Sequence, residues 1–339
     1  MSIRVLLGDC RDVLRTLADE SVHCVVTSPP YFGLRDYDVD GQIGLEPTPG
    51  CYVAQLAGVF DEVRRVLRSD GTLWLNLGDS YAGSGKGGNP EESEHRKQAT
   101  NRGTIVRSKR DAPRWGGGNI PATEGLKAKD LIGIPWRVAF ALQDTGWWLR
   151  QDIIWSKPNP MPESVTDRCT KAHEYIFMLT KSAHYYYDAD AIAEPAIYAG
   201  LTGQDASGFK DAKKFDGKHS DKQRGHSRRH AGFNDRWDRM ERAEQCSGTR
   251  NKRSVWSVAT RPYADAHFAT FPPDLIEPCI KAGCPEDGTV LDPFGGAGTT
   301  GLVADRLARN AILIELNPAY DEMARARISK DCPMFSEVA

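Results

Sequence analysis

The chain has 339 residues, of which 40% are hydrophobic and 27% are charged, and its formal net charge is −2 at pH 7. This length suffices for one large domain with insertions, or for two domains. No apolar run is long enough to span a bilayer and the N-terminus carries no signal-peptide pattern, so we expect an intracellular protein without a membrane partner. The net charge alone neither favours nor excludes nucleic acid, because local patches determine such binding.

The eight cysteines are scattered along the chain and form no Cys-x-x-Cys pair. Several of them lie in apolar segments that have the pattern of a strand or a helix. Cysteines in such a context are more often reduced thiols of the core than metal ligands or disulfide partners. The sequence therefore predicts neither a zinc site nor a disulfide framework, and we expect no metal.

Short apolar runs rich in β-branched residues predict seven strands, at residues 3–7, 22–26, 72–77, 148–155, 173–180, 288–291 and 311–314. Amphipathic segments between them predict helices at residues 12–17, 52–67, 131–142, around 275–280 and at 302–307. Asp70-Gly71 is the expected stop of the second helix. Strands that alternate with helices predict an α/β fold with a mostly parallel sheet, in which ligands bind at the carboxyl ends of the strands.

The segment Thr27-Ser28-Pro29-Pro30-Tyr31 follows the second predicted strand. Two consecutive prolines forbid both helix continuation and strand pairing, so the chain must leave the sheet in a stiff extended turn. A planar ligand with an exocyclic NH2 group can stack on Tyr31 and donate its two hydrogens to the Ser28 hydroxyl and the Pro29 carbonyl. The alternative is an ordinary proline turn with a tyrosine in the core.

A glycine-rich segment follows the strand at residues 288–291, and glycines 296, 298 and 301 have the Gly-x-Gly-x-x-Gly spacing. Glycines let the backbone approach a ligand closely, and Glu315 at the end of the next strand suits a bidentate contact with ribose hydroxyls. Asp292, just before the turn, suits a ligand that carries an ammonium group. The pattern predicts a nucleoside ligand, and leaves open whether this is a dinucleotide or S-adenosyl-L-methionine.

Two segments differ in composition from the rest of the chain. Residues 83–125 are rich in glycine and basic residues, and predict a loop that stays mobile unless something anionic holds it. Residues 200–253 hold fourteen Lys and Arg against eight Asp and Glu, with histidines and aromatic residues between them. This second segment is either a solvated insertion or a surface that lies along nucleic acid.

Together, TSPPY at 27–31 and LDPFGGAGTT at 291–300 resemble the motifs of the DNA amino-methyltransferases that use S-adenosyl-L-methionine. Their order resembles the β arrangement, in which the Ser-Pro-Pro-Tyr segment precedes target recognition and the cofactor loop comes last. The resemblance covers the chain except residues 83–125 and 200–253. It implies a seven-stranded, mostly parallel, Rossmann-like methyltransferase sheet, circularly permuted from the more usual order. In this sheet the strands before the two motifs are neighbours, so Tyr31 and Asp292 face one crevice.

The resemblance also implies one methyltransferase domain in two parts. Its catalytic part is residues 1–190, with the basic loop 83–125, and its cofactor-binding part is residues 255–339. Between them lies a loop-rich target-recognition insertion at residues 191–254. The implied catalytic residues are Ser28, Pro29, Pro30 and Tyr31. The implied cofactor-binding residues are Asp9, Thr27, His267, Phe271, Asp292, Phe294, Gly296, Gly298, Thr299, Thr300 and Glu315.

Asp9 is implied as an acceptor for the adenine amino group, although a lone Gly-Asp pair is also typical of a helix cap. The implied reaction is direct methyl transfer to the exocyclic amine of a flipped base in double-stranded DNA, with neither a covalent intermediate nor a metal. Serine in the first position of the tetrapeptide favours cytosine N4, and adenine N6 is the alternative. The resemblance implies a cytoplasmic protein of bacterial or phage origin. It leaves open a cognate restriction endonuclease as partner, and a monomer or a homodimer.

Three other functions compete with this interpretation. An NAD-dependent oxidoreductase would use the glycine loop and Glu315, but leaves Ser28 to Tyr31 unexplained. A methyltransferase for RNA or a protein amide shares the tetrapeptide, and the basic insertion favours DNA over both. A non-catalytic DNA-binding relative would not need two intact motifs. Further polar residues either contact the target nucleotide or cap turns and pair on the surface: Asn76, Asp79, Lys157, Asn159, Arg168, His173 and Glu174.

Overall fold

The structure is a computed structural model that describes residues 2–34, 37, 39–82, 125–196, 249–261, 271–331 and 337–338. It divides into two compact units, one made of Met1–Asp188 with Arg253–Ala339 and the other of Ala189–Lys252. The predictions for the loop 83–125, for most of the insertion 191–254 and for His267 fall on residues outside the described ranges. The target-recognition role of the insertion therefore stays a prediction.

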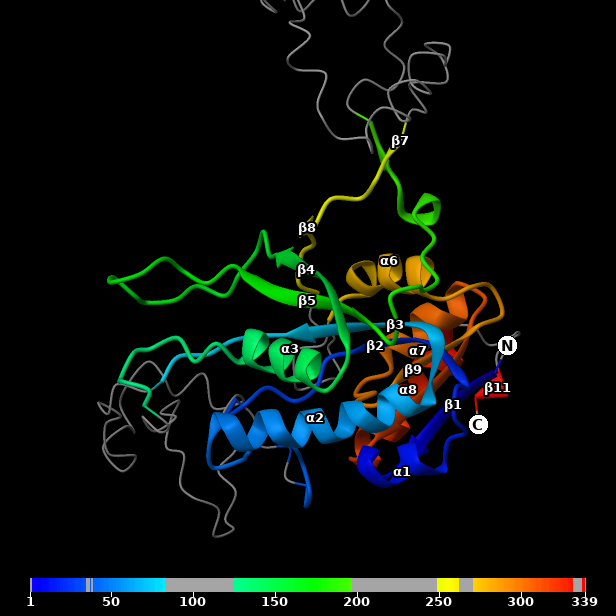
Figure 1. Cartoon of the computed structure of the whole chain (residues 1–339), viewed down its shortest axis with the longest axis horizontal. Helices are drawn as coiled ribbons and strands as arrows, with labels where there is room; N and C mark the ends of the chain where they lie inside the picture. Colours follow the sequence, from blue (N-terminus) through cyan, green and yellow to red (C-terminus); the bar gives the residue numbers. More distant parts are fainter. Residues whose placement is uncertain are drawn as a thin grey trace, which may run out of the picture. The chain divides into compact units, whose positions relative to one another are not determined.

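The larger unit is built on one sheet of nine strands in the order β11-β1-β10-β9-β2-β3-β5-β4-β8 (Figure 1). Strand β5 runs antiparallel to both of its neighbours, and the other strand pairs are parallel. The strands are β1 (Ser2–Leu7), β2 (Val22–Thr27), β3 (Leu67–Leu77), β4 (Trp148–Ser156), β5 (His173–Thr180), β8 (Val255–Ser257), β9 (Thr289–Asp292), β10 (Asn310–Glu315) and β11 (Glu337–Val338).

All seven predicted strands are present, and the mostly parallel α/β sheet is confirmed. The short strands β8 and β11 extend the two edges of the sheet. They were not predicted, because three and two residues are too few to show an apolar period. The smaller unit contributes a separate pair of two-residue strands, β6 (Glu194–Pro195) and β7 (Thr249–Arg250), which are antiparallel.

Helices cover both faces of the sheet (Figure 1). Three pack on one face, where their apolar side chains and those of the strands form the largest core: α1 (Cys10–Thr16), α2 (Pro49–Val66) and α3 (Ile134–Asp144). The other three pack on the opposite face: α6 (Pro273–Gly283), α7 (Thr299–Arg306) and α8 (Pro318–Asp331). None of the helices in the described ranges is long and apolar enough to cross a membrane.

The junction between α2 and β3 differs from the prediction. Asp70-Gly71 does not stop the helix, because α2 ends at Val66 and β3 begins at once with Leu67 and continues through both residues. The register between β2 and β3 shifts here, and a Cβ on Gly71 would lie 2.5 Å from the side chain of Leu67. Gly71 is thus required by close packing within an irregular strand, and the turn signal was misread.

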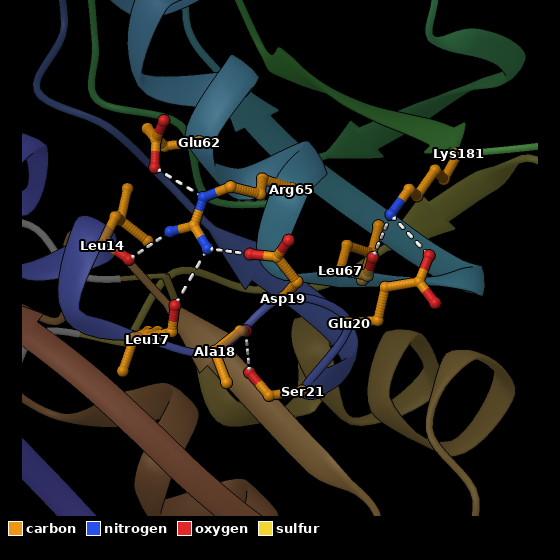
Figure 2. Close-up of polar contacts among 10 residues, drawn as sticks. All are labelled: Leu14, Leu17, Ala18, Asp19, Glu20, Ser21, Glu62, Arg65, Leu67 and Lys181. Carbon is orange, nitrogen blue, oxygen red and sulfur yellow. Dashed lines mark hydrogen bonds and ion pairs between the residues drawn. The ribbon is translucent and has the colours of Figure 1, made fainter.

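Side chains hold this junction in place (Figure 2). The Arg65 guanidinium on α2 donates to the carbonyl oxygens of Leu14 and Leu17, which close the C-terminal end of α1. Lys181 donates to the carbonyl of Leu67, the residue at which α2 passes into β3. Arg65 therefore ties α2 to the end of α1, and Lys181, which follows β5, ties the end of α2 to the sheet, both through backbone acceptors that helix ends leave free.

Six cysteines lie in the described ranges, and all six are free thiols. The prediction that several cysteines are core thiols is confirmed by the four that are buried, whereas Cys51 and Cys169 are exposed. Within the same ranges no group of three His, Cys, Asp or Glu side chains is placed to hold a metal ion. The buried thiols are Cys10, Cys24, Cys279 and Cys284.

Candidate active site

Two neighbouring strands bring the distant motifs together at the carboxyl ends of the parallel strands. Strands β2 and β9 are parallel neighbours, with Cys24 opposite Val290 and Val25 opposite Leu291. Both strands therefore end on the same side of the sheet, at its carboxyl end, and the segments that follow them leave the sheet side by side. We call Ser28–Tyr31 the proline corner and Asp292–Thr300 the glycine loop. The predicted pairing of the two strands is confirmed.

A direct hydrogen bond joins the starts of these two segments. The Thr27 hydroxyl donates to Oδ1 of Asp292 at 2.6 Å, across 265 positions of sequence. Oδ2 of Asp292 accepts from the Thr300 hydroxyl at 2.6 Å, and Oδ1 also accepts from the backbone N–H of Phe294 at 3.0 Å. Only 1% of Asp292 is exposed, and burial raises its pKa to about 6. The first task of this carboxylate is thus to fasten the glycine loop to β2, which the sequence did not predict.

The proline corner is supported from below by helix α2. The hydroxyl of Tyr52, which is fully buried, donates to the carbonyl of Pro30 at 2.8 Å. The ring of Phe32 packs against that of Tyr52, with 5.5 Å between their centroids. Pro29 is buried, whereas Ser28 and Tyr31 are half-buried. The corner therefore presents a hydroxyl and part of an aromatic ring above a fixed backbone.

The Tyr31 side chain is held at both its ring and its hydroxyl. A Cβ on Gly78 would lie 2.5 Å from the ring, so the backbone of Gly78 lies against it. The hydroxyl donates to Oε2 of Glu174 at 2.7 Å and lies 3.1 Å from Oδ1 of Asn76. Burial, followed by the charge of Glu174, raises the pKa of Tyr31 well above its usual value. Tyr31 is therefore a neutral phenol whose ring is fixed in one position.

The two polar residues at the end of β3 have different places. Asn76 lies beside Tyr31, whose hydroxyl is 3.1 Å from its amide oxygen, and its contact with the target nucleotide stays a prediction. Asp79 caps helix α3, because its carboxylate accepts from the backbone N–H groups of Gly133 and Ile134. For Asp79 the structure therefore shows the capping alternative.

The glycine loop is shaped around Glu315 at the end of β10. Oε2 of Glu315 accepts from the N–H of Gly296 at 2.7 Å, and Oε1 accepts from the N–H of Asn317 at 2.8 Å. Burial raises the pKa of this half-buried carboxyl. Gly298 has φ +75°, and a Cβ there would lie 2.9 Å from that of Ala324 on α8. Gly296 has φ +49°, and the nearest described atom beyond its chain neighbours lies 3.9 Å from the place of its Cβ, so a ligand can approach the backbone there.

Helix α8 supplies a residue that sequence reasoning missed. Nη1 of Arg327 donates to the carbonyl of Ala297 and to the hydroxyl of Thr299, each at 2.9 Å. Thr299 and Thr300 are buried, so their hydroxyls form hydrogen bonds inside the protein, to Arg327 and Asp292. The segment was not predicted as a helix because little of it is apolar: its buried residues are Asp321, Ala324 and Ile328.

The other predicted cofactor residues occupy different environments. Asp9 caps α1, and the guanidinium of Arg11 binds its carboxylate and lowers its pKa. Phe294 is half-buried and packs against the core, and Phe271 is half-buried at the start of the segment that leads into α6. His267 lies outside the described residues. The structure therefore shows Asp9 as a cap, and its contact with adenine stays a prediction.

The weaker candidates are mostly paired. Lys157 forms an ion pair with Glu174 and lies over the ring of Trp155, 4.3 Å from its centroid. Arg168 binds Glu163 at 2.7 Å and stacks on Tyr81. Asn159 exchanges two hydrogen bonds with the backbone of Thr260. His173 packs edge-on against Tyr175. Of these residues, Lys157 and Glu174 are the ones that the structure connects to Tyr31.

A family model with the description DNA methylase, for the N6 and N4 type, matches residues 22–326. The chain belongs to the DNA methylase family. The Type II methyltransferase M.Cfr9I of Citrobacter freundii is 44% identical over 321 residues, which cover 95% of this chain and 86% of that protein. The Type II methyltransferase M.SmaI of Serratia marcescens is 41% identical over 327 residues, which cover 96% of this chain and 91% of the relative. The resemblance seen in the sequence is thereby confirmed.

Solved structures of the same fold agree with this DNA methylase architecture. The cytosine-N4-specific PvuII DNA methyltransferase superposes with a TM-score of 0.59 at 18% identity, covering 96% of this chain and 87% of the other. TTHA0409 from Thermus thermophilus, complexed with S-adenosyl-L-methionine, superposes with a TM-score of 0.56 at 22% identity, covering 99% of this chain and 97% of the other. The fold of this DNA methylase is thus a Rossmann-like methyltransferase fold.

Proposed function

We propose that this DNA methylase transfers the methyl group of S-adenosyl-L-methionine to an exocyclic amine of a flipped base in double-stranded DNA. The proposed target is cytosine N4, and adenine N6 is the alternative. The observation that carries the proposal is the Thr27–Asp292 hydrogen bond, because it fastens the last residue of β2, which the proline corner follows, directly to the glycine loop. A methyl donor bound at the loop then lies beside an amine bound at the corner, which removes most of the orientational barrier.

The residues at the glycine loop suit this methyl donor, which supplies an electrophilic methyl group on a positively charged sulfur. The half-buried carboxylate of Glu315 follows β10 and is placed for ribose hydroxyls. Among the described residues, the atom nearest to the place of a Cβ on Gly296 is 3.9 Å away, so a ligand can approach the backbone there. The buried carboxylate of Asp292, which accepts from Thr27 and Thr300, supplies negative charge for an ammonium group bound at the loop. Binding of S-adenosyl-L-methionine by TTHA0409, which has the same fold, supports this proposal.

The proline corner suits the amine. The lone pair of an exocyclic amine is conjugated with the ring, so the nitrogen must become pyramidal before the lone pair can attack. In the proposed complex its two hydrogens go to the Ser28 hydroxyl and the Pro29 carbonyl, while the base stacks on Tyr31. The lone pair then points at the methyl group, and the corner acts by orientation and by placing acceptors. Flipping a base out of the duplex costs a few kcal/mol. Stacking of the flipped base on Tyr31 contributes about 1–3 kcal/mol and offsets part of this cost.

The choice of base and the partners belong to the proposal. Serine as the first residue of the tetrapeptide supports cytosine N4. We propose that residues 191–254 recognise the DNA sequence, on the strength of the basic and aromatic composition of that insertion. The Type II names of the relatives support a role beside a restriction endonuclease. The family assignment removes the oxidoreductase interpretation.

Sequencing that detects modified bases tests the proposal in one experiment. DNA from cells that express the chain should carry a methylated amine at a defined sequence, and the chemical identity of the mark separates cytosine N4 from adenine N6. The Ser28→Ala variant should lose the marks by about 100-fold or more, because it removes one of two acceptors for the amine. Binding of S-adenosylhomocysteine by the purified variant controls for folding. Identical marks from the variant would contradict the assignment of the proline corner.

A further inference from the structure

Hydrogen bonds lead from the proposed reaction centre to an ion pair. The Ser28 hydroxyl donates to the Tyr31 hydroxyl oxygen at 3.5 Å, and the Tyr31 hydroxyl donates to Oε2 of Glu174 at 2.7 Å. The other oxygen of Glu174 accepts from the Lys157 ammonium. We call these four side chains the hydroxyl chain. It exists because β5 runs antiparallel to β3, which brings the start of β5 to the edge where the parallel strands end.

The ion pair gives the hydroxyl chain a direction. The Lys157 ammonium has only donors, and the Glu174 carboxylate has only acceptors. The two side chains are 18% and 15% exposed, so little water competes with their contacts. The amide nitrogen of Asn76 donates to Glu174 at 3.4 Å and to the carbonyl of Tyr175 at 3.1 Å. Every neighbour of Glu174 in this cluster therefore points a hydrogen at it.

The single hydrogen of the Tyr31 hydroxyl has two acceptors in reach. Oε2 of Glu174 is 2.7 Å away and belongs to a charged group, whereas the amide oxygen of Asn76 is neutral and 3.1 Å away. The charged, nearer acceptor makes the stronger hydrogen bond. Once Tyr31 donates to Glu174, its oxygen can only accept, and the hydrogen of Ser28 points at it.

This direction matters for the reaction at Ser28. A serine hydroxyl can accept a hydrogen bond from the target amine or donate one to its lone pair. Donation would occupy the electron pair that has to attack the methyl group. A Ser28 hydrogen that points at Tyr31 leaves the lone pairs of the hydroxyl free for the amine hydrogens.

We propose that Glu174 is a positioning residue, which fixes the hydroxyl hydrogens of Tyr31 and Ser28 so that Ser28 remains an acceptor for the target amine. This inference rests on the proposed function. Glu174 acts through Tyr31 and Ser28, and Lys157 holds its carboxylate in place.

The Glu174→Gln variant tests the direction. Lys157 has only donors, so it takes the amide oxygen of the new side chain, and the NH2 group then faces Tyr31. Tyr31 becomes an acceptor, and its hydrogen turns toward Asn76 or Ser28. We expect kcat to fall about 10- to 100-fold, while the dissociation constant for S-adenosylhomocysteine and the KM for DNA change less than about threefold. The matched control is Asp167→Asn, which makes the same change in an exposed ion pair with Lys129, and should keep the wild-type kcat.

A second variant separates direction from a merely structural role. In Lys157→Met combined with Glu174→Gln, the donor on the Oε1 side is gone, so the amide oxygen can turn to the Oε2 side, where Tyr31 and the amide nitrogen of Asn76 lie. We expect this double variant to be about tenfold more active than Glu174→Gln alone. In a Tyr31→Phe background, which breaks the hydroxyl chain but keeps the ring, Glu174→Gln should change kcat less than about twofold.

Three results would overturn the inference: a Glu174→Gln enzyme with wild-type kcat, a double variant no more active than Glu174→Gln, or full additivity with Tyr31→Phe. If Glu174→Gln does not fold, the Tyr31→Phe variant still tests whether the hydroxyl chain is required. It must lower kcat by the same 10- to 100-fold at unchanged affinity for S-adenosylhomocysteine. A wild-type protein that methylates no DNA would contradict the proposed function instead, so the two failures are distinguishable.

Discussion

The proline corner and the glycine loop follow neighbouring strands, yet the structure holds them by different means. The glycine loop is fastened by buried groups, since Asp292, Thr299 and Thr300 are at most 3% exposed. Asp292 accepts from Thr300 and from the N–H of Phe294, and Thr299 accepts from Arg327. The proline corner ends in half-buried side chains, which reach an ion pair at the edge of the sheet. Damage to the loop should therefore lower stability and cofactor affinity, and damage to the corner should lower turnover.

The largest effect is expected at Asp292. Replacing it with alanine removes three hydrogen bonds and leaves the hydroxyl of Thr27 and the N–H of Phe294 without this acceptor, while Thr300 keeps only the Val26 carbonyl at 3.4 Å. Unsatisfied buried donors and a lost network typically destabilise a protein by several kcal/mol, here about 3–5 kcal/mol. Urea unfolding of Asp292→Ala measures this loss. A variant of unchanged stability would contradict the view that the loop is fastened from within.

The pH dependence of stability should also separate the two regions. Burial raises the pKa of Asp292 to about 6, so the folded chain holds this proton more tightly than the unfolded chain does. That contribution favours folding below about pH 4 and is lost as the pH rises through about 6. Relative to Asp292→Asn, the free energy of unfolding of the wild type should fall by about 1–3 kcal/mol between pH 4 and pH 6.5. Urea midpoints at the two pH values test this, and a constant difference between the proteins would refute it.

Gly78 offers a test on the side of the corner. A methyl group there would lie 2.5 Å from the ring of Tyr31 and must displace it. We expect Gly78→Ala to lower kcat about 10- to 100-fold with little change in S-adenosylhomocysteine affinity, because only the proline corner moves. Gly58→Ala on α2 is the control, since a methyl group there meets no described atom within 4 Å outside its own helix, and it should stabilise the chain by about 0.5–1 kcal/mol. Equal kinetics for the two variants would show that the ring position is unimportant.

A smaller effect is expected at Arg327. Its guanidinium holds the Ala297 carbonyl and the Thr299 hydroxyl from α8, outside the buried network. Arg327→Ala should weaken S-adenosyl-L-methionine binding about 3- to 10-fold and leave kcat at saturation within about twofold, because the loop loosens while the corner is intact. Calorimetric titration with S-adenosylhomocysteine provides the measurement. A loss confined to kcat would place Arg327 with the corner.

The sequence located the places where each strand delivers its side chains, because apolar runs, prolines and glycines are local signals. Thr27, Ser28 and Asp292 stand at the predicted strand ends, and the motif resemblance placed those ends together. The contacts that hold them depend on distant residues. Glu174 meets Tyr31 across 143 positions, and Arg327 lies on a helix with almost no apolar stripe. The misread stop at Asp70-Gly71 has a partly similar origin, since a Cβ on Gly71 would lie 3.0 Å from the carbonyl oxygen of His23 on β2 as well as 2.5 Å from nearby Leu67.

The edge strand β11 has a consequence for the order in which the two motifs can follow each other along the chain. Strand β11 pairs with β1, so Ser2 is the register partner of Glu337 and the labelled N and C ends lie near each other in Figure 1. A short tether could close the backbone into a ring, and reopening it within residues 197–248 would place the glycine loop ahead of the proline corner. Every contact between β2 and β9 would survive such a rearrangement. The order of the two motifs along this chain could therefore be reversed, while the pairing that brings the two strand ends together would be kept.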